Sequence, residues 1–115
     1  MADKSITRGR TARKAALAPQ FDKLIHERMR LGIVSALAVN DRLAFNDLKH
    51  LLGTSDGNLS VHARRLEEAG YLVAHRSDSG RNARTEYELT AAGRSALQAY
   101  LNEMEAIIAR TREGL

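Results

Sequence analysis

The sequence lacks cysteine and tryptophan and contains a single proline among its 115 residues. Without cysteine there are no disulfides and no thiolate metal ligands, so we expect a protein of a reducing compartment, the cytoplasm. No apolar run reaches the roughly 18 residues of a membrane-spanning helix. The basic N-terminus also lacks the apolar stretch of a secretory signal. These absences predict a soluble protein with no membrane partner.

Aromatic residues are equally scarce, with three tyrosines and two phenylalanines in the whole chain. Proteins that follow single-stranded nucleic acids stack successive bases on aromatic side chains. Five rings are too few for such a series of platforms. The length fits one folded domain, because single domains most often have about 100–150 residues.

Positive charge is concentrated at the N-terminus. Residues 1–20 contain five basic side chains and one acidic one, which equals the formal net charge of +4 of the whole chain. Residues 1–18 show no hydrophobic periodicity, so we expect a flexible basic arm there and one folded domain over residues 19–115. A basic arm suggests a polyanionic partner, although a solvated, disordered terminus would have the same composition.

Hydrophobic periodicity predicts four helices and one hairpin after the arm. The first helix covers residues 21–39, and a short second helix begins at a cap on Asn46 and ends at Gly53. The third helix covers about residues 56–69 and is capped by Ser55. The predicted strands are residues 71–75 and 85–89, and Thr90 caps a last helix over about residues 90–110. This order predicts a mainly α fold with a small β-hairpin.

The third helix has a narrow apolar stripe and a broad polar face. Leu59, Ala63 and Leu66 fall on one side at helical spacing and should be buried. His62 falls at the edge of this stripe. The residues that point away from it are Gly57, Asn58, Ser60, Val61, Arg64 and Arg65.

Two helices joined by a tight glycine-containing turn and followed by a hairpin with a basic tip describe a winged helix-turn-helix. The segment LKHLLGTSDGNLSVHARRLEEAGYL, residues 48–72, resembles the core of bacterial winged-helix transcriptional regulators related to the MarR and ArsR families. The closing LTAAGR, residues 89–94, also matches. ArsR-type metal sensors often use cysteines, or histidines in the last helix, and neither is present after Thr90. The resemblance therefore implies DNA binding rather than metal sensing.

In this fold the third helix is the recognition helix and lies in the major groove of double-stranded DNA. Asn58 could bond an adenine edge, and Val61 could contact a thymine methyl group. The predicted DNA-binding residues of this helix are Ser55, Gly57, Asn58, Ser60, Val61, His62, Arg64 and Arg65. An ordinary solvated helix face would carry similar side chains, and a structural hydrogen bond would explain His62 as well as a phosphate contact.

The hairpin tip, about residues 76–84, is the expected wing. Its predicted DNA contacts, on the backbone or in the minor groove, are Arg76, Arg81, Asn82 and Arg84. A soluble loop that is basic by chance is the alternative.

Catalytic and metal-binding patterns are lacking. Ser60 and His62 are two positions apart on a helix and diverge, so they cannot form a nucleophile–base pair. The four histidines fall on different elements without metal-ligand spacing. We expect no enzyme, no catalytic residues, no metal site and no cofactor.

The last helix carries an apolar stripe longer than a three-helix core of this size needs. We expect it to form a homodimer interface through Leu97, Tyr100, Leu101, Met104, Ile107 and Ile108. Packing of this stripe onto the first helix of the same chain is the alternative. The sequence thus predicts a homodimeric regulator that binds specific double-stranded DNA. A winged-helix protein-interaction module, or a regulator gated by a small molecule in the dimer cleft, would share these features.

Overall fold

The computed structural model describes residues 21–77 and 83–115. The expected arm, residues 1–18, and the hairpin tip at residues 78–82 lie outside this part of the chain. The elements are α2 (Arg28–Ala38), β1 (Leu43–Ala44), α3 (Phe45–Leu52), α4 (Asp56–Glu68), β2 (Leu72–Ser77), β3 (Arg84–Leu89) and α5 (Ala91–Gly114). The predicted order of helices and hairpin is confirmed, and the architecture is a winged helix.

The sheet contains one strand more than the sequence predicts. Its antiparallel order is β1-β3-β2, so the central strand is β3. The additional strand, β1, pairs Leu43 with Tyr87 and Ala44 with Glu86. Two residues are too few to show the alternation that identifies a strand, so only the partner strand reveals β1.

The first helix begins later than predicted, at Arg28 instead of residue 21. The carboxylate of Asp22 accepts hydrogen bonds from the backbone N–H groups of Leu24 and Ile25 and holds this segment in a turn. Glu27 then caps α2, because its side chain accepts from the backbone N–H of Arg30. The apolar residues at 21, 24 and 25 are helically spaced, but these local hydrogen bonds keep the segment out of the helix.

The other helix ends follow ordinary capping rules, with one correction. Ser55 and Thr90 cap α4 and α5 as predicted, through side-chain oxygens that accept backbone N–H groups. Asn46 does not cap α3: the cap position is Ala44, which makes no side-chain hydrogen bond. Gly53 ends α3 in the left-handed conformation, with a φ of 58°, which glycine adopts without strain.

The core lies between the helices and the inner face of the sheet. Each of α2, α3, α4, β3 and α5 contributes, and Ile33, Leu48, Leu59 and Leu66 are fully buried. The first part of α5 is also close-packed, since a Cβ atom at Gly93 would collide with the carbonyl group of Tyr71. This contact places the start of α5 against the start of the hairpin.

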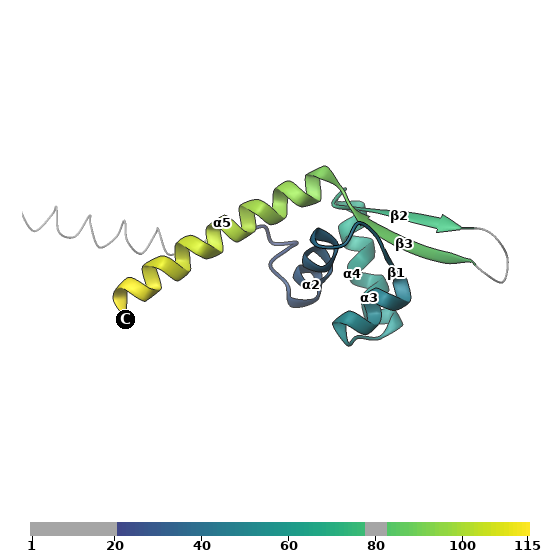
Figure 1. Ribbon diagram of the computed structural model, residues 1–115, viewed down its shortest axis with the longest axis horizontal. Coiled ribbons are helices and arrows are strands. Elements are labelled where there is room, and N and C mark those ends of the chain that lie inside the picture. The colour runs from purple at the N-terminus through teal and green to yellow at the C-terminus, as the bar shows by residue number, and fades with distance from the viewer. Residues whose placement is uncertain (1–20, 78–82) are drawn as a thin grey trace, which may run out of the picture.

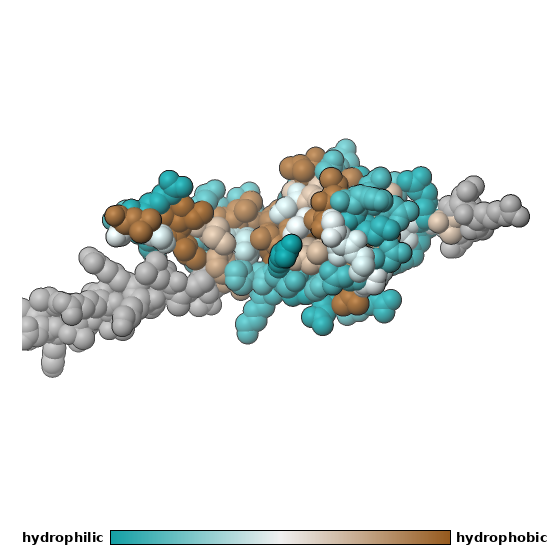
Figure 2. Space-filling view, turned by 90° about the horizontal axis from the view of Figure 1, so that it is seen from below, coloured by the Kyte–Doolittle hydropathy of each residue, from teal (hydrophilic) through white to brown (hydrophobic). Residues whose placement is uncertain are grey.

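After Tyr100, which is still buried, α5 leaves the domain. Figure 1 shows it running from the sheet past α2, with its C-terminal half projecting on the side opposite the hairpin. Figure 2 shows hydrophobic residues along the projecting half, whereas the face around α3 and α4 is largely hydrophilic. The projecting half of α5 is therefore amphipathic, and it leaves Ile108 exposed to solvent.

Candidate nucleic-acid interface

The polar face of α4 has the exposure that the helical spacing predicts. Leu59, Ala63 and Leu66 are completely buried and anchor the helix on the core. The side opposite this stripe is open to solvent, and its exposed residues are Gly57, Asn58, Ser60, Val61, Arg64 and Arg65. The helix thus offers amide, hydroxyl, apolar and guanidinium groups on one continuous surface.

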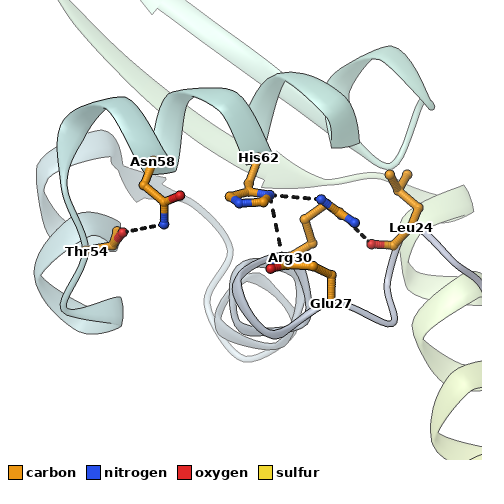
Figure 3. Close-up of polar contacts among 6 residues, drawn as sticks. All are labelled: Leu24, Glu27, Arg30, Thr54, Asn58 and His62. Atoms are coloured by element: carbon orange, nitrogen blue, oxygen red, sulfur yellow. Dashed lines mark hydrogen bonds and ion pairs between the residues drawn. The ribbon is translucent and has the colours of Figure 1, made fainter.

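Asn58 is held at the beginning of this surface. Its side-chain amide donates a hydrogen bond to Oγ1 of Thr54 over 2.9 Å, and its backbone N–H donates to Oγ of Ser55. Figure 3 shows the carboxamide on the first turn of α4, above Thr54. An amide nitrogen carries two hydrogens and the side-chain oxygen accepts, so a donor and an acceptor remain for a further partner.

His62 is turned toward α2 rather than outward. Its side chain is 17% exposed, and its Nδ1 lies 2.9 Å from Nη1 of Arg30 and 3.7 Å from Oε1 of Glu27 (Figure 3). The sequence left a structural hydrogen bond and a phosphate contact open for His62, and the contact seen within the protein is the one with Arg30. The other predicted DNA-binding residues of α4 face solvent, so His62 does not share their surface.

Two of the four wing residues predicted to contact DNA, Arg76 and Arg84, lie in the described part of the chain. Arg76 makes two hydrogen bonds, of 3.0 and 3.3 Å, to the carboxylate of Glu67 on α4. The Glu67 carboxylate raises the pKa of Arg76. Arg84 on β3 lies 3.7 Å from a carboxylate oxygen of Glu86. The positions of Arg81 and Asn82 fall outside the described residues.

A hollow that the sequence did not predict separates the wing from the start of α3. Its volume is about 980 Å³. The lining residues are Ala44, Phe45, Asn46, Asp47, Arg76, Ser77, Ala83, Arg84 and Thr85. The pairing of β1 with β3 forms this hollow, because it brings the beginning of α3 beside the C-terminal end of β2 and the N-terminal end of β3.

Arg30 is a buried polar residue that sequence analysis missed. It is 7% exposed and precedes Ile33, Val34 and Leu37, so it occupies the buried stripe of α2. The sequence did contain a sign of this burial, because Arg30 follows the same helical spacing as Ile33, Val34 and Leu37. A charged residue in an apolar stripe requires polar partners, and those partners are identifiable only from the fold.

The predicted interface on α5 divides into buried and exposed residues. Leu97 and Tyr100 are buried in the core of the chain itself, and Tyr100 contacts the ring of Phe21 at 4.8 Å between centroids. Leu101 and Ile108 are 42% and 43% exposed, and Met104 and Ile107 are partly buried. The apolar surface left uncovered is therefore shorter than predicted and lies on the projecting half of the helix.

Within residues 21–77 and 83–115, no three histidine, aspartate or glutamate side chains gather in a way that could hold a metal ion. None of the described helices is both long and apolar enough to cross a membrane.

Comparison with known proteins gives consistent results. Residues 29–108 match the family described as "Winged helix DNA-binding domain". An uncharacterized protein of Methanocaldococcus jannaschii is 32% identical over 82 residues, which cover 71% of this chain and 89% of the relative. A transcriptional regulator homologue from Pyrococcus horikoshii OT3 is 26% identical with a TM-score of 0.74, covering 85% of this chain and 94% of its own.

A MarR-family transcriptional regulator from Silicibacter pomeroyi shares the fold. Its TM-score is 0.64 at 20% identity, and the alignment covers 100% of this chain and 77% of the regulator. The two structural relatives are described as a regulator homologue and a regulator, and neither is described as an enzyme.

Proposed function

Because the chain belongs to the winged helix DNA-binding domain family, we propose that it is a cytoplasmic transcriptional regulator that binds a specific double-stranded DNA sequence as a homodimer. The observation that carries the proposal is the solvent-exposed polar face of α4 together with the exposed arginines of the wing, Arg76 and Arg84. In the proposed complex α4 lies in the major groove and the wing contacts the backbone or the minor groove. No residue is assigned a catalytic role.

The side chains of α4 fit this role by their chemistry. The major groove is about 12 Å wide and admits one helix, and the first turns of that helix reach the base edges. Asn58, Ser60 and Val61 are exposed in the first half of α4. Arg64 and Arg65 follow one turn later, where they would reach guanine or phosphate. The wing residues Arg76, Arg81, Asn82 and Arg84 complete the proposed contact set.

The homodimer is supported by the exposed leucine and isoleucine of the projecting half of α5. A two-fold arrangement through Leu101, Met104, Ile107 and Ile108 would bury this surface and place two copies of α4 on one face. Dimeric helix-turn-helix proteins contact half-sites about 34 Å apart, one turn of DNA. We therefore expect a palindromic binding site.

The N-terminal arm is proposed to add affinity without sequence preference. Its five basic residues would contact phosphates rather than base edges. Deletion of residues 2–18 should flatten the dependence of log affinity on log salt concentration and leave the preferred sequence unchanged.

Selection of genomic DNA fragments by the purified protein, followed by sequencing, tests the proposal. Enrichment of one palindromic sequence, whose binding weakens steeply with salt, is the expected result. A protein-interaction module would enrich no sequence. It would instead bind a protein partner through apolar contacts that salt leaves largely intact.

A second candidate function is control of DNA binding by a small molecule. A hollow of about 510 Å³ lies between α2 and α5 and includes His26, Glu27, Leu31 and Tyr100 in its lining. Small molecules that raise the melting temperature of the wild-type protein should lose this effect in Ser35→Trp, because the added ring would fill the hollow. Equal stabilisation of both proteins would exclude this site.

A further inference from the structure

Arg30 contacts two separate parts of the chain through one buried side chain. Its Nε donates a hydrogen bond of 2.5 Å to the backbone carbonyl of Leu24, and its Nη1 lies 2.9 Å from Nδ1 of His62. Figure 3 shows the guanidinium group between the segment that precedes α2 and the underside of α4. The same side chain therefore joins the N-terminal segment to the helix proposed to read DNA.

The N-terminal segment is in turn attached to α5. Phe21 stacks on His26 at 4.6 Å between ring centroids, and Nδ1 of His26 lies within hydrogen-bond distance, 2.9 Å, of the Tyr100 hydroxyl group. A continuous set of contacts thus runs from α5 through residues 21–26 and Arg30 to His62. Arg30 is the polar member of this set that reaches α4.

The contact with Arg30 requires one protonation state of His62. A guanidinium group has only donors, so Nδ1 of His62 must accept, and the proton of the neutral ring must be on Nε2. A protonated imidazole has donors at both nitrogens. Protonation of His62 therefore breaks its hydrogen bond with Arg30 and places two positive charges at this contact.

The charged groups around His62 come from α2 and its cap. Glu27 lies 3.7 Å from Nδ1, but its carboxylate already accepts the backbone N–H of Arg30 as the helix cap. A protonated His62 would turn from Arg30 toward this carboxylate. From the other elements beside α4, Arg76 of β2 is paired with Glu67, and Lys49 of α3 lies 2.7 Å from Asp56.

We propose that Arg30 is a positioning residue for DNA binding, which holds α4 in its reading orientation through a hydrogen bond to neutral His62. This inference rests on the proposed function. A proton on Nδ1 of His62 would remove this hydrogen bond, and histidine is the side chain that ordinarily exchanges a proton near neutral pH. Glutamine at position 62 can accept from Arg30 with its side-chain oxygen and does not titrate.

The test compares the wild-type protein with His62→Gln on the selected DNA site at pH 8.0 and 5.5, by fluorescence anisotropy. The two proteins should bind with similar affinity at pH 8.0. At pH 5.5 His62→Gln should bind about two- to tenfold more tightly than wild type, the effect expected for one hydrogen bond. His75→Gln is the matched control, because His75 of β2 contacts Glu88 of β3 outside the wing, and it should show no such gain.

A second measurement does not depend on DNA. Nitrogen NMR of the His62 ring at pH 8.0 should show the Nε2–H tautomer in the wild-type protein and a mixture of tautomers in Arg30→Met. The inference would be overturned if the ratio of the His62→Gln affinity to the wild-type affinity were the same at pH 5.5 as at pH 8.0. A predominant Nδ1–H tautomer of His62 in the wild-type protein would also overturn it. Failure of the wild-type protein to bind any DNA at either pH would refute the proposed function itself, and the inference with it.

Discussion

At the scale of single residues, the first turn of α4 holds Asn58, the side chain that we propose distinguishes bases. Asn58 is exposed, yet its amide is oriented by Thr54 over 2.9 Å, so it is presented in a defined direction. Asparagine pairs with adenine by donating and accepting at once, and ordering of the side chain before binding lowers the entropic cost. Arg84 lies on the wing, where phosphate contacts are expected instead.

Asn58→Ala should therefore weaken binding to the selected site by about 1–3 kcal/mol and leave binding to random DNA nearly unchanged. Arg84→Ala should weaken both kinds of DNA by similar factors and reduce the salt slope by about one unit. Anisotropy titrations at several salt concentrations measure both quantities. Equal losses on both DNAs for Asn58→Ala, together with a change of sequence preference in Arg84→Ala, would show that the assignment of α4 and the wing is reversed.

Tyr71 gives a residue-scale prediction about stability. Its hydroxyl group donates a hydrogen bond to the Asp22 carboxylate, and this bond, with burial and the negative charge of Asp22, raises the pKa of Tyr71 to about 12. In the unfolded chain a tyrosine ionises near pH 10. The raised pKa thus contributes stability that is complete below about pH 10 and is lost as the pH rises through 12.

Urea denaturation at pH 9, 11 and 12 should show this loss as a fall in the free energy of unfolding. The fall should be shallower in Tyr71→Phe, which has no group to ionise. A parallel decline in both proteins would mean that Tyr71 does not contribute.

At the scale of elements, the wing is tied to α4 by a pair of side chains. Arg76 on β2 and Glu67 on α4 make two hydrogen bonds, so the guanidinium group predicted to contact DNA is also engaged within the protein. Exposed ion pairs of this kind stabilise by about 1 kcal/mol or less. We expect this pair to affect DNA binding mainly by fixing the angle between the wing and α4.

Arg76→Glu should weaken DNA binding by about tenfold or less, because it places two carboxylates opposite each other and displaces the wing. The double variant Glu67→Arg with Arg76→Glu keeps the net charge and reverses the pair, and it should recover most of the lost affinity. If Arg76 acts only through a phosphate, the double variant will remain as weak as the single one. Circular dichroism melts confirm that both variants are folded.

At the scale of the whole molecule, α5 separates two surfaces of different character. Its first turns pack into the core through Leu97 and Tyr100, and its projecting half exposes Leu101 and Ile108. A helix with an apolar stripe in water is typical of an interface. The rigid connection through the first turns would let a dimer formed at one end set the spacing of two α4 helices at the other.

Leu101→Glu combined with Ile108→Glu should convert the proposed dimer into monomers that keep the fold, since neither side chain belongs to the core. Sedimentation velocity at tens of micromolar measures the change, and Gln98→Glu with Asn102→Glu is a control that adds the same charge at exposed polar positions of α5. A monomeric wild-type protein under these conditions would contradict the dimer.

Local patterns in the sequence determined the order of the elements, the caps of α4 and α5 and the exposed face of α4. Helical periodicity and capping depend on residues within a few positions of one another, and these can be recognised without the fold. Ser55, Leu59, Ala63 and Leu66 were identified correctly for this reason. The late start of α2 was missed because its cap is Glu27, which is not a typical cap residue. The capping capacity of Asp22, which holds the preceding turn through its carboxylate, was overlooked.

Only the tertiary structure decided which distant groups meet. Arg30 and His62 are separated by 32 positions and Arg76 and Glu67 by nine, across different elements, and no periodic pattern relates them. The two residues of β1 form a strand only because β3 supplies its hydrogen-bonding partners. The stripe of α5 likewise looks uniform in sequence, and only the packing of the domain determines which part of it is buried and which part stays exposed to solvent.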